Sequence, residues 1–367
     1  MTDTNIDNKD LQFSDEDIRM DFELRCAAQQ DNLPDAEKEW KEFRSNRLKE
    51  NREKSHNSSV KFKVLAVAVA VAACLLLLLM PYWERDSKDE QPSENALMYV
   101  SPPPMDGIAL SVGDKEVAIG SQEARSKGVV MSDDSVIQFL TSENVAAENR
   151  NTITIPQGQV ARIQLPDGTR VSLSARSRLI FPHRFLANAP REVYLSGEGY
   201  FEVARDESRP FIVHSGLVST RVLGTTFNIR SYEGEMPQVT LVSGSVICKV
   251  KSPKTQGSSA KPQEMVLKPG QQLVVLNSQV SVNKVDTDEV TSWKDGYFCF
   301  GKQTLKDVLI EIARWYNVNV TFVNEEHIGD YVHYNGERSW SIQKVVDQLN
   351  AICETKIIYE NQTLTVN

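Results

Sequence analysis

GEGYFEVARDESRPF, residues 197–211, places two glycines, two adjacent aromatic residues and an Arg-Pro pair in a segment that otherwise alternates like a β-strand. A phosphate-binding loop would follow a buried apolar strand and open a helix. Here Tyr200, Phe201 and Val203 continue the strand alternation instead. The stretch therefore predicts a feature of the fold rather than a ligand site.

The small and charged residues of this region each have a structural interpretation. Arg209, which precedes Pro210, is predicted to form an ion pair with Glu198 or Glu202. Glycine tolerates backbone conformations that other residues avoid, so glycines inside strands predict tight turns or bulges. The glycines that we interpret in this way are Gly197, Gly199, Gly224 and Gly244.

The same alternation extends over about residues 107–289, in short runs broken by Gly, Asn, Asp and Pro, which predicts an all-β domain. Residues 108–119 and 161–173 resemble each other, each with two alternating runs around a Gly-Asp or Asp-Gly turn; in the second the turn is Asp167-Gly168. Such turns supply the positive φ that tight hairpins need. This weak repeat is compatible with a solenoid-like or a sandwich-like domain, and residues 251–263 are predicted to be an excursion between strands.

Composition excludes some classes of function. The chain has 367 residues, 25% of them charged, and a formal net charge of -9. Its length allows two or three domains. A nucleic-acid-binding protein usually presents a strongly basic face, which this charge does not predict, so we expect no direct contact with nucleic acid.

Residues 64–80, VLAVAVAVAACLLLLLM, carry no charge and continue into Pro81, Tyr82 and Trp83. Residues 64–83 therefore predict a transmembrane helix, which begins too far along the chain for a cleaved signal peptide. The residues before it are much richer in Lys and Arg than those behind it. By the positive-inside rule we expect a single-pass protein of the inner membrane, with residues 1–63 in the cytoplasm and its C-terminus in the periplasm. Residues 84–106, polar and then proline-rich, predict a periplasmic linker.

The cytoplasmic region, residues 1–63, predicts two short helices, at about 14–30 and 34–54. The first is apolar on two opposite sides, and two helices with so few apolar residues cannot enclose a core of their own. We therefore expect them to complete their burial on a partner protein, although a frayed anchor that merely precedes the membrane is the alternative. The residues predicted to contact the partner are Ile18, Met20, Phe22, Leu24, Trp40 and Phe43.

The last part of the chain, residues 290–367, changes to a mixed pattern. Residues 304–317 and 341–353 show helical periodicity, and the runs around them alternate like strands, ending in a hairpin. This predicts a small α+β domain of βαββαβ order. The final strand, Thr363, Leu364, Thr365 and Val366, is predicted to have an exposed edge to which a partner strand could be added.

Several motifs in order resemble the FecR family of transmembrane anti-sigma regulators. They are IQLPDGTRVSLSARSRLIFP (163–182), REVYLSGEGYFEVARDESRPFIVHSG (191–216), TRVLGTTFNIR (220–230) and VTLVSGSVICKV (239–250). The block SWKDGYFCFGKQTLKDVLIEIARWYNVNVTF (292–322) is similar to the domain that follows FecR in Bacteroidota members, which resembles the short N-terminal module of secretins and TonB-dependent transporters.

The resemblance implies a relay across two membranes. A loaded TonB-dependent outer-membrane transporter would present its signalling domain to the periplasmic part of the regulator. The cytoplasmic part would then release or activate an extracytoplasmic-function (ECF) sigma factor. The resemblance also implies regulated proteolysis by membrane proteases. Separately, we expect no cofactor and no metal site.

Two other classes of function have less support in the sequence. The histidines have no metal-binding spacing and no nucleophile elbow occurs, so we expect no enzyme. A membrane-anchored periplasmic binding or scaffold protein, without a sigma factor, is the alternative; aromatic residues of the last domain could then form a platform. Cys248, Cys299 and Cys353 fall in the exported part, where one disulfide is compatible with the sequence and free buried thiols are expected more.

Overall fold

The computed structural model describes residues 98–367, apart from residues 114, 133–134, 142–144, 147–148, 252–262, 277–278 and 324–325. The predicted cytoplasmic helices, the helix at 64–83 and most of the 251–263 excursion lie outside the described residues. Among the described residues, no helix combines the length and the apolar character that crossing a membrane requires.

Residues 109–284 form the β domain, whose strands are short, as the alternation predicts. Helix α4 (Gln122–Ser126) of this domain is capped by the Ser121 side chain, which accepts a hydrogen bond from the Ala124 amide. The strands are β2 (Ala109–Val112), β3 (Lys115–Glu116), β4 (Val129–Met131), β5 (Val136–Phe139), β6 (Arg150–Thr154), β7 (Ala161–Gln164), β8 (Arg170–Leu173), β9 (Arg178–Pro182), β10 (Arg191–Glu202), β11 (Phe211–Ser215), β12 (Val218–Val222), β13 (Thr226–Ser231), β14 (Gln238–Ser243), β15 (Val246–Val250), β16 (Gln263–Leu267), β17 (Gln271–Leu276) and β18 (Gln279–Lys284).

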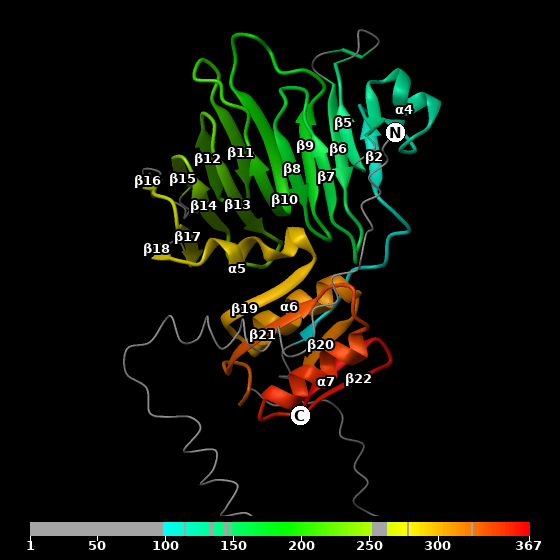
Figure 1. Cartoon of the computed structure of the whole chain (residues 1–367), viewed down its shortest axis with the longest axis vertical. Helices are drawn as coiled ribbons and strands as arrows, with labels where there is room; N and C mark the ends of the chain where they lie inside the picture. Colours follow the sequence, from blue (N-terminus) through cyan, green and yellow to red (C-terminus); the bar gives the residue numbers. More distant parts are fainter. Residues whose placement is uncertain are drawn as a thin grey trace, which may run out of the picture. The chain divides into compact units, whose positions relative to one another are not determined.

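The strands of the β domain pair into two sheets that share β10 (Figure 1). One sheet has the order β3-β2-β6-β9-β10-β11-β12-β15-β16, and the other has the order β4-β5-β7-β8-β10-β13-β14-β17-β18. The chain moves from one sheet to the other every one or two strands. The solenoid-like and sandwich-like alternatives therefore each describe part of the fold, because a winding chain builds two sheets around one core.

Strand β10 contains the first half of the 197–211 stretch and passes from one sheet to the other at Gly197. Residues 194–196 pair with β9, whereas residues 197–202 pair with β13 and residues 199–202 with β8. Gly197 has φ +103°, and a Cβ atom there would lie 2.6 Å from the Ser177 Cα. Only glycine fits this close approach. The fold-signature interpretation of this glycine is confirmed.

The core of the β domain lies between the inner faces of the two sheets and is apolar. Phe201, from the same stretch, is fully buried and stacks on Phe227 with ring centroids 5.2 Å apart. One buried ion pair lies among these residues: the Arg191 guanidinium donates to Asp167 Oδ2 at 2.8 Å and to the Ala204 carbonyl at 2.9 Å. The predicted Asp167-Gly168 turn joins β7 and β8 and also supplies the partner of this arginine.

Residues 287–367 form the C-terminal domain and its connection. The elements are α5 (Thr287–Thr291), the 3₁₀ helix η1 (Ser292–Asp295), β19 (Tyr297–Thr304), α6 (Leu305–Tyr316), β20 (Asn319–Phe322), β21 (Tyr331–Glu337), α7 (Ile342–Ile352), β22 (Ile357–Glu360) and β23 (Thr363–Val366). The predicted strand and helix order is therefore present. Helix α6 contacts β19, β20 and β21, and α7 contacts β21 and β22, so both helices lie between a two-stranded and a four-stranded sheet (Figure 1).

The four-stranded sheet corrects two expectations. Its order is β1-β20-β23-β22. Strand β23 pairs with β20 on one side and with β22 on the other, so the predicted free edge at Thr363–Val366 is wrong. Strand β1 (Met98–Tyr99) lies inside the segment predicted as a linker, yet it pairs with β20. Strand order depends on contacts distant in sequence, which local alternation does not encode.

Candidate functional site at the junction of the two domains

A buried charge network joins the β domain to the C-terminal domain. At its centre is Glu311 of α6, which is 4% exposed. Arg230 of β13 donates to Glu311 Oε2 at 2.7 Å, and Arg338, just after β21, donates to Oε1 at 2.9 Å. Arg314, one turn along α6, also donates to Oε2. One carboxylate therefore holds three guanidinium groups from three elements. Buried charges persist in this way only when they are paired and hydrogen-bonded.

The turn between β13 and β14 adds a second carboxylate and an aromatic ring. Glu235 accepts from Arg230 at 3.0 Å and also from Arg314. The Tyr232 ring lies between the same two arginines, with the Arg314 guanidinium 3.7 Å and the Arg230 guanidinium 5.3 Å from its centroid. The Tyr232 hydroxyl donates to the Ala175 carbonyl at 2.9 Å. These contacts fix both arginines in orientation.

A third carboxylate, Glu198 of β10, lies at the β-domain side of the network. Its Oε1 accepts from Asn228 Nδ2 at 3.0 Å, and its Oε2 lies 3.6 Å from an Arg230 nitrogen. Asn228 Oδ1 in turn accepts from the Trp293 indole N–H at 3.3 Å. Trp293 is in η1, so this hydrogen bond ties the connection between the domains to β13.

Aromatic residues cover Arg338 on the C-terminal side. Its guanidinium lies 4.5 Å from the Phe298 ring centroid and 4.8 Å from that of Trp315. The Trp315 indole donates to the Arg338 carbonyl at 2.9 Å. Arg338 is therefore held in three ways: its charge pairs with Glu311, its carbonyl accepts a hydrogen bond, and the plane of its guanidinium lies against aromatic rings. Trp315, which the scaffold alternative would place on an exposed platform, takes part in this packing instead.

The two buried glutamates have opposite pKa shifts. Burial would raise the pKa of Glu311, but Arg230, Arg314 and Arg338 together hold it well below its usual range. The pKa of Glu198 is raised to about 7, chiefly because burial outweighs the lowering by Arg230; the Glu311 carboxylate adds to the rise and the Asn228 hydrogen bond opposes it. Glu311 is therefore a fixed anion, whereas Glu198 titrates near neutral pH.

A cleft of about 710 Å³ opens beside the network, and residues of both domains line it. Glu198, Arg230, Glu311 and Arg338 are among them. These four side chains already pair with one another. The arrangement is suited to holding two domains in one defined orientation.

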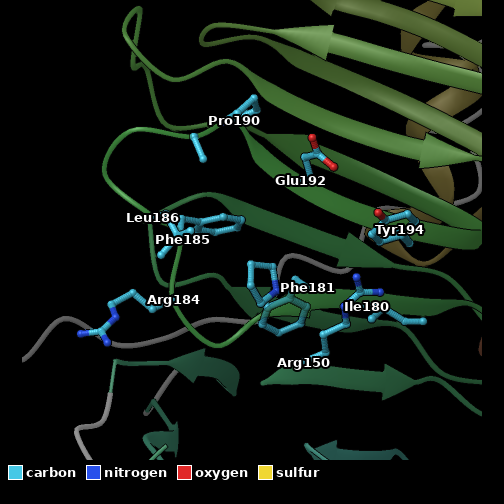
Figure 2. Close-up of a pocket in the computed structure, with 11 residues that line it drawn as sticks. Arg150, Ile180, Phe181, Arg184, Phe185, Leu186, Pro190, Glu192 and Tyr194 are labelled. Carbon is cyan, nitrogen blue, oxygen red and sulfur yellow. The ribbon is translucent and has the colours of Figure 1, made fainter. Parts of the chain in front are cut away.

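A second candidate surface is a groove of about 350 Å³ on β9, β10 and the loop between them (Figure 2). Tyr194 lies under the Arg150 guanidinium, 5.2 Å away, and stacks on His214 at 4.9 Å. Glu192 Oε2 lies 3.3 Å from His214 Nε2. Leu186, on the loop, is 60% exposed. Apolar and charged side chains both line the groove. The best-defined contact at its edge is the stack of Tyr194 on His214.

The sequence predicts the wrong partner for one residue of the network and does not single out others. Arg209 is predicted to pair with Glu198 or Glu202, but the partners of Glu198 are Asn228 and Arg230. Arg209 pairs with Asp206 at 2.8 Å, close in sequence and partly exposed, so the predicted partner is corrected. Glu311 and Arg314 carried a signal that was missed: they are charged residues three positions apart on a helix, beside its apolar stripe. The residues predicted to bind a sigma factor lie outside the described residues.

Other expectations for single residues have mixed outcomes. Gly244 has φ +92° in the turn between β14 and β15, as predicted. Gly224 instead lies against the Arg205 backbone, 2.8 Å from its Cα if a Cβ atom is added. Gly199 lies in mid-strand, opposite Ile229 and Leu173. The three cysteines of the described residues are free, and burial raises the pKa of Cys248 to about 12.

Comparison with known proteins identifies both regions. The family described as FecR protein matches residues 151–247, and the family described as FecR, C-terminal matches residues 297–366. Two crystal structures of a candidate anti-sigma factor from Parabacteroides distasonis ATCC 8503, at 1.65 Å and 2.50 Å resolution, are similar to the chain. Each is 26% identical, covers 59% of this chain and 98% of its own, and has a TM-score of 0.52. No curated protein matches.

The fold and its junction thus define a class: a two-domain module in which a winding β domain is joined to a small α+β domain. Residues 151–247 and 297–366 of the chain match the models of the FecR family. The resemblance seen in the sequence motifs is confirmed.

Proposed function

We propose that the chain is a FecR-type anti-sigma factor, which holds a sigma factor at the membrane until a signal arrives outside. The observation that carries the proposal is the pair of FecR regions joined through the Glu311 network, in a chain similar to a candidate anti-sigma factor. A network of this kind lets the exported part respond as one body.

The finer parts of the proposal come from the sequence. Residues 64–83 cross the inner membrane once, with residues 1–63 in the cytoplasm. The two-sided helix around Ile18 and Phe22, with Trp40, lies in a groove of an ECF sigma factor. A TonB-dependent outer-membrane transporter supplies the periplasmic signal. Cleavage by membrane proteases then frees the sigma factor, because a single helix transmits small movements poorly.

Affinity capture tests the sigma-factor interaction. The full-length chain with a C-terminal tag is purified from its host as wild type, as Phe22→Asp and as the matched control Phe13→Asp, which lies outside the predicted contact set. Mass spectrometry then identifies the captured proteins. We expect a sigma factor with the wild type and with Phe13→Asp, and at least a tenfold loss with Phe22→Asp.

Two results would count against the proposal. Equal recovery of the sigma factor with Phe22→Asp would reject the predicted contact face. A soluble, correctly inserted chain that captures no sigma factor at all would favour the membrane-anchored scaffold instead.

A further inference from the structure

The cleft of about 710 Å³ beside the charge network, which we call the junction cleft, has a volume typical of sites for small ligands. The β domain contributes residues of β13, β14, β17 and β18 to its lining. The C-terminal domain contributes residues of β19, α6 and β21, and Arg338 just after β21. A small molecule bound in the junction cleft is therefore able to touch both domains.

Arg338 lines the junction cleft with a guanidinium group that is fixed in place. Its side chain is 4% exposed. Nε donates to the Tyr297 carbonyl at 3.1 Å, and Nη2 donates to Glu311 Oε1 at 2.9 Å. The rings of Phe298 and Trp315 lie against the group, at 4.5 Å and 4.8 Å. These contacts orient the guanidinium before any ligand arrives, which lowers the entropy cost of binding to it.

The third nitrogen of Arg338, Nη1, is buried and has no hydrogen-bond partner among the residues that the structure describes. Arg230 and Arg314 differ in this respect, because each of them donates to both Glu235 and Glu311. A buried donor without an acceptor costs free energy, so buried polar atoms are nearly always paired. Nη1 is therefore the donor of the network that is still able to bind a further acceptor.

The lysines of the junction cleft favour an anionic ligand. Lys284, Lys302 and Lys306 line it, and within the described part of the chain they form no ion pair. Lys302 instead lies over the Tyr331 ring, 4.8 Å from its centroid. Unpaired cations around a cleft raise the local concentration of anions and the rate at which they enter.

The carboxylates of the junction cleft, in contrast, already accept hydrogen bonds from the protein. Those of the network bind arginines or Asn228, as described above. Outside the network, Asp286 accepts from the Asp288 amide at 2.9 Å, Glu289 from the Gly301 amide at 2.6 Å and Asp307 from the Thr304 hydroxyl at 2.7 Å. In the described lining, the charged groups that are left without a partner are therefore positive.

A flat apolar surface lies next to Arg338. Tyr297, whose carbonyl accepts from Arg338, is 51% exposed and lines the junction cleft. Tyr331, which also lines it, is 65% exposed. Aromatic rings in a concave site are surfaces on which the body of a ligand packs, while a few polar groups fix its orientation. The lining therefore suits an acid with a flat apolar body.

We propose that the junction cleft binds a small organic acid, whose anionic group accepts a hydrogen bond from Arg338 Nη1 and whose flat body packs against Tyr297. Carboxylates and phosphates share the chemistry that a guanidinium recognises. A ligand that binds the folded chain stabilises it, and this one binds where the two domains meet. Occupancy of the junction cleft therefore strengthens the junction. The site is independent of the sigma-factor interaction.

Ligand-observed NMR of the purified full-length chain in detergent micelles, with empty micelles as the blank, tests the site. Phenylacetate carries a carboxylate, phenyl phosphate carries a phosphate, and phenylacetamide is the neutral control. A ligand of about ten non-hydrogen atoms binds with a Kd of about 1 mM when its affinity per atom is ordinary. We expect at least one acid to bind in this range, and its preference over the other identifies the anionic group. The amide should bind at least tenfold more weakly, because it lacks the charge that strengthens the hydrogen bond to Arg338.

Two pairs of variants locate the bound acid. Tyr297→Ala removes the ring but keeps the carbonyl that holds Arg338, so it should weaken binding about fivefold. Tyr194→Ala, which removes an exposed tyrosine from the groove on β9 and β10, should bind like the wild type. Lys306→Gln should weaken binding about threefold by removing a nearby charge. Its control, Lys356→Gln, changes an exposed lysine of the same domain outside the lining and should have no effect.

Arg338→Lys tests the proposed hydrogen bond directly. It keeps a positive charge but has no Nη1 atom, so the acid should bind at least tenfold more weakly. The substitution also removes hydrogen bonds to Tyr297 and Glu311, so folding is checked by the melting temperature. Where this variant does not fold, Tyr297→Ala and Lys306→Gln decide, because neither residue supplies a side chain to the network.

Three results would overturn the proposal. If neither acid bound the wild type at about 20 mM, far above the expected Kd, Arg338 Nη1 would not serve as a ligand site. Equal binding of phenylacetamide would show that no charge is recognised. Loss of binding in Tyr194→Ala but not in Tyr297→Ala would assign the acid to the groove on β9 and β10 instead. None of these readouts needs a sigma factor, so failure here and failure of sigma-factor capture are distinguishable.

Discussion

The core of the β domain and the junction between the domains are both buried, yet opposite kinds of contact hold them. In the core, Phe201 and Phe227 stack among other apolar side chains. At the junction, Glu311 is also buried, but it is paired with three arginines. An apolar core accepts any side chain of about the right size. A charged junction accepts only one arrangement, so its contribution is to orientation more than to stability.

The largest expected effect sharpens this comparison with two substitutions that preserve shape. Glu311→Gln leaves three guanidinium groups around a neutral amide, and breaking a buried ion pair costs about 3–5 kcal/mol. Leu241→Met, in the β-domain core, also nearly keeps its volume and should cost less than about 1.5 kcal/mol. Urea unfolding of the full-length chain, followed by tryptophan fluorescence, measures both.

Glu354 is exposed and lies in the C-terminal domain, as Glu311 does, so Glu354→Gln is the control for the loss of a carboxylate there. A Glu311→Gln variant no less stable than Leu241→Met would mean that the junction is not held by its charges. The comparison between the two regions would then fail.

The second prediction concerns the pH dependence of the junction. Burial raises the pKa of Glu198 to about 7, from 4.5 for an unperturbed glutamate. Between pH 4.5 and about 7, the folded chain therefore keeps a proton on Glu198 that the unfolded chain has lost. The stability that this difference contributes is fully present below pH 4.5. The free energy of unfolding falls as the pH rises through about 7, by on the order of 3 kcal/mol in all. Glu311 has the opposite sign, because its pKa is lowered, and it acts only in more acidic solution.

Glu198→Gln should remove this decline. Urea midpoints of the wild type should fall between pH 5 and pH 7.5, while those of the variant stay nearly level, so that the variant is the more stable chain at pH 7.5. Glu202→Gln, four residues along the same strand and exposed, should keep the slope of the wild type. Parallel slopes for Glu198→Gln and the wild type would show that Glu198 does not titrate in this window.

Sequence reasoning anticipated the two regions unequally. The strands of the β domain and the helices α6 and α7 follow from alternation and helical periodicity, which are local signals. Thr304, at the start of the segment with helical periodicity, caps α6 by accepting from the Asp307 amide. These features need only neighbouring residues, so one sequence is enough to predict them.

The junction and the contact of residues 98–101 with the C-terminal domain could not be anticipated in the same way. Arg230 and Glu311 are 81 residues apart, and Ser101 and Asn319 are 218 apart. No periodicity links such positions. The central place of β23 was missed for the same reason, because an alternating strand looks the same at the edge of a sheet and within it.

The smallest expected effect concerns Arg209, which the sequence singled out as a structural ion pair. Its partner, Asp206, is close in sequence, and hydrogen bonds from Ser208 and Arg209 hold the pKa of that carboxyl below its usual range. The deeper contact of this residue is its carbonyl oxygen, which accepts from Arg191 Nε at 3.0 Å. Arg209→Ala keeps that carbonyl, so it should lower the melting temperature less than Leu241→Met does.

Arg191→Ala provides the contrast, because Arg191 is 1% exposed and its loss leaves the buried Asp167 carboxylate without its cation. That variant should melt far lower than Arg209→Ala. Arg205→Ala, whose ion pair with Glu207 is largely exposed, should melt like the wild type. If Arg209→Ala melted as low as Arg191→Ala, the surface pair would be essential to the fold. The contrast between exposed and buried charges would then have to be abandoned for this part of the β domain.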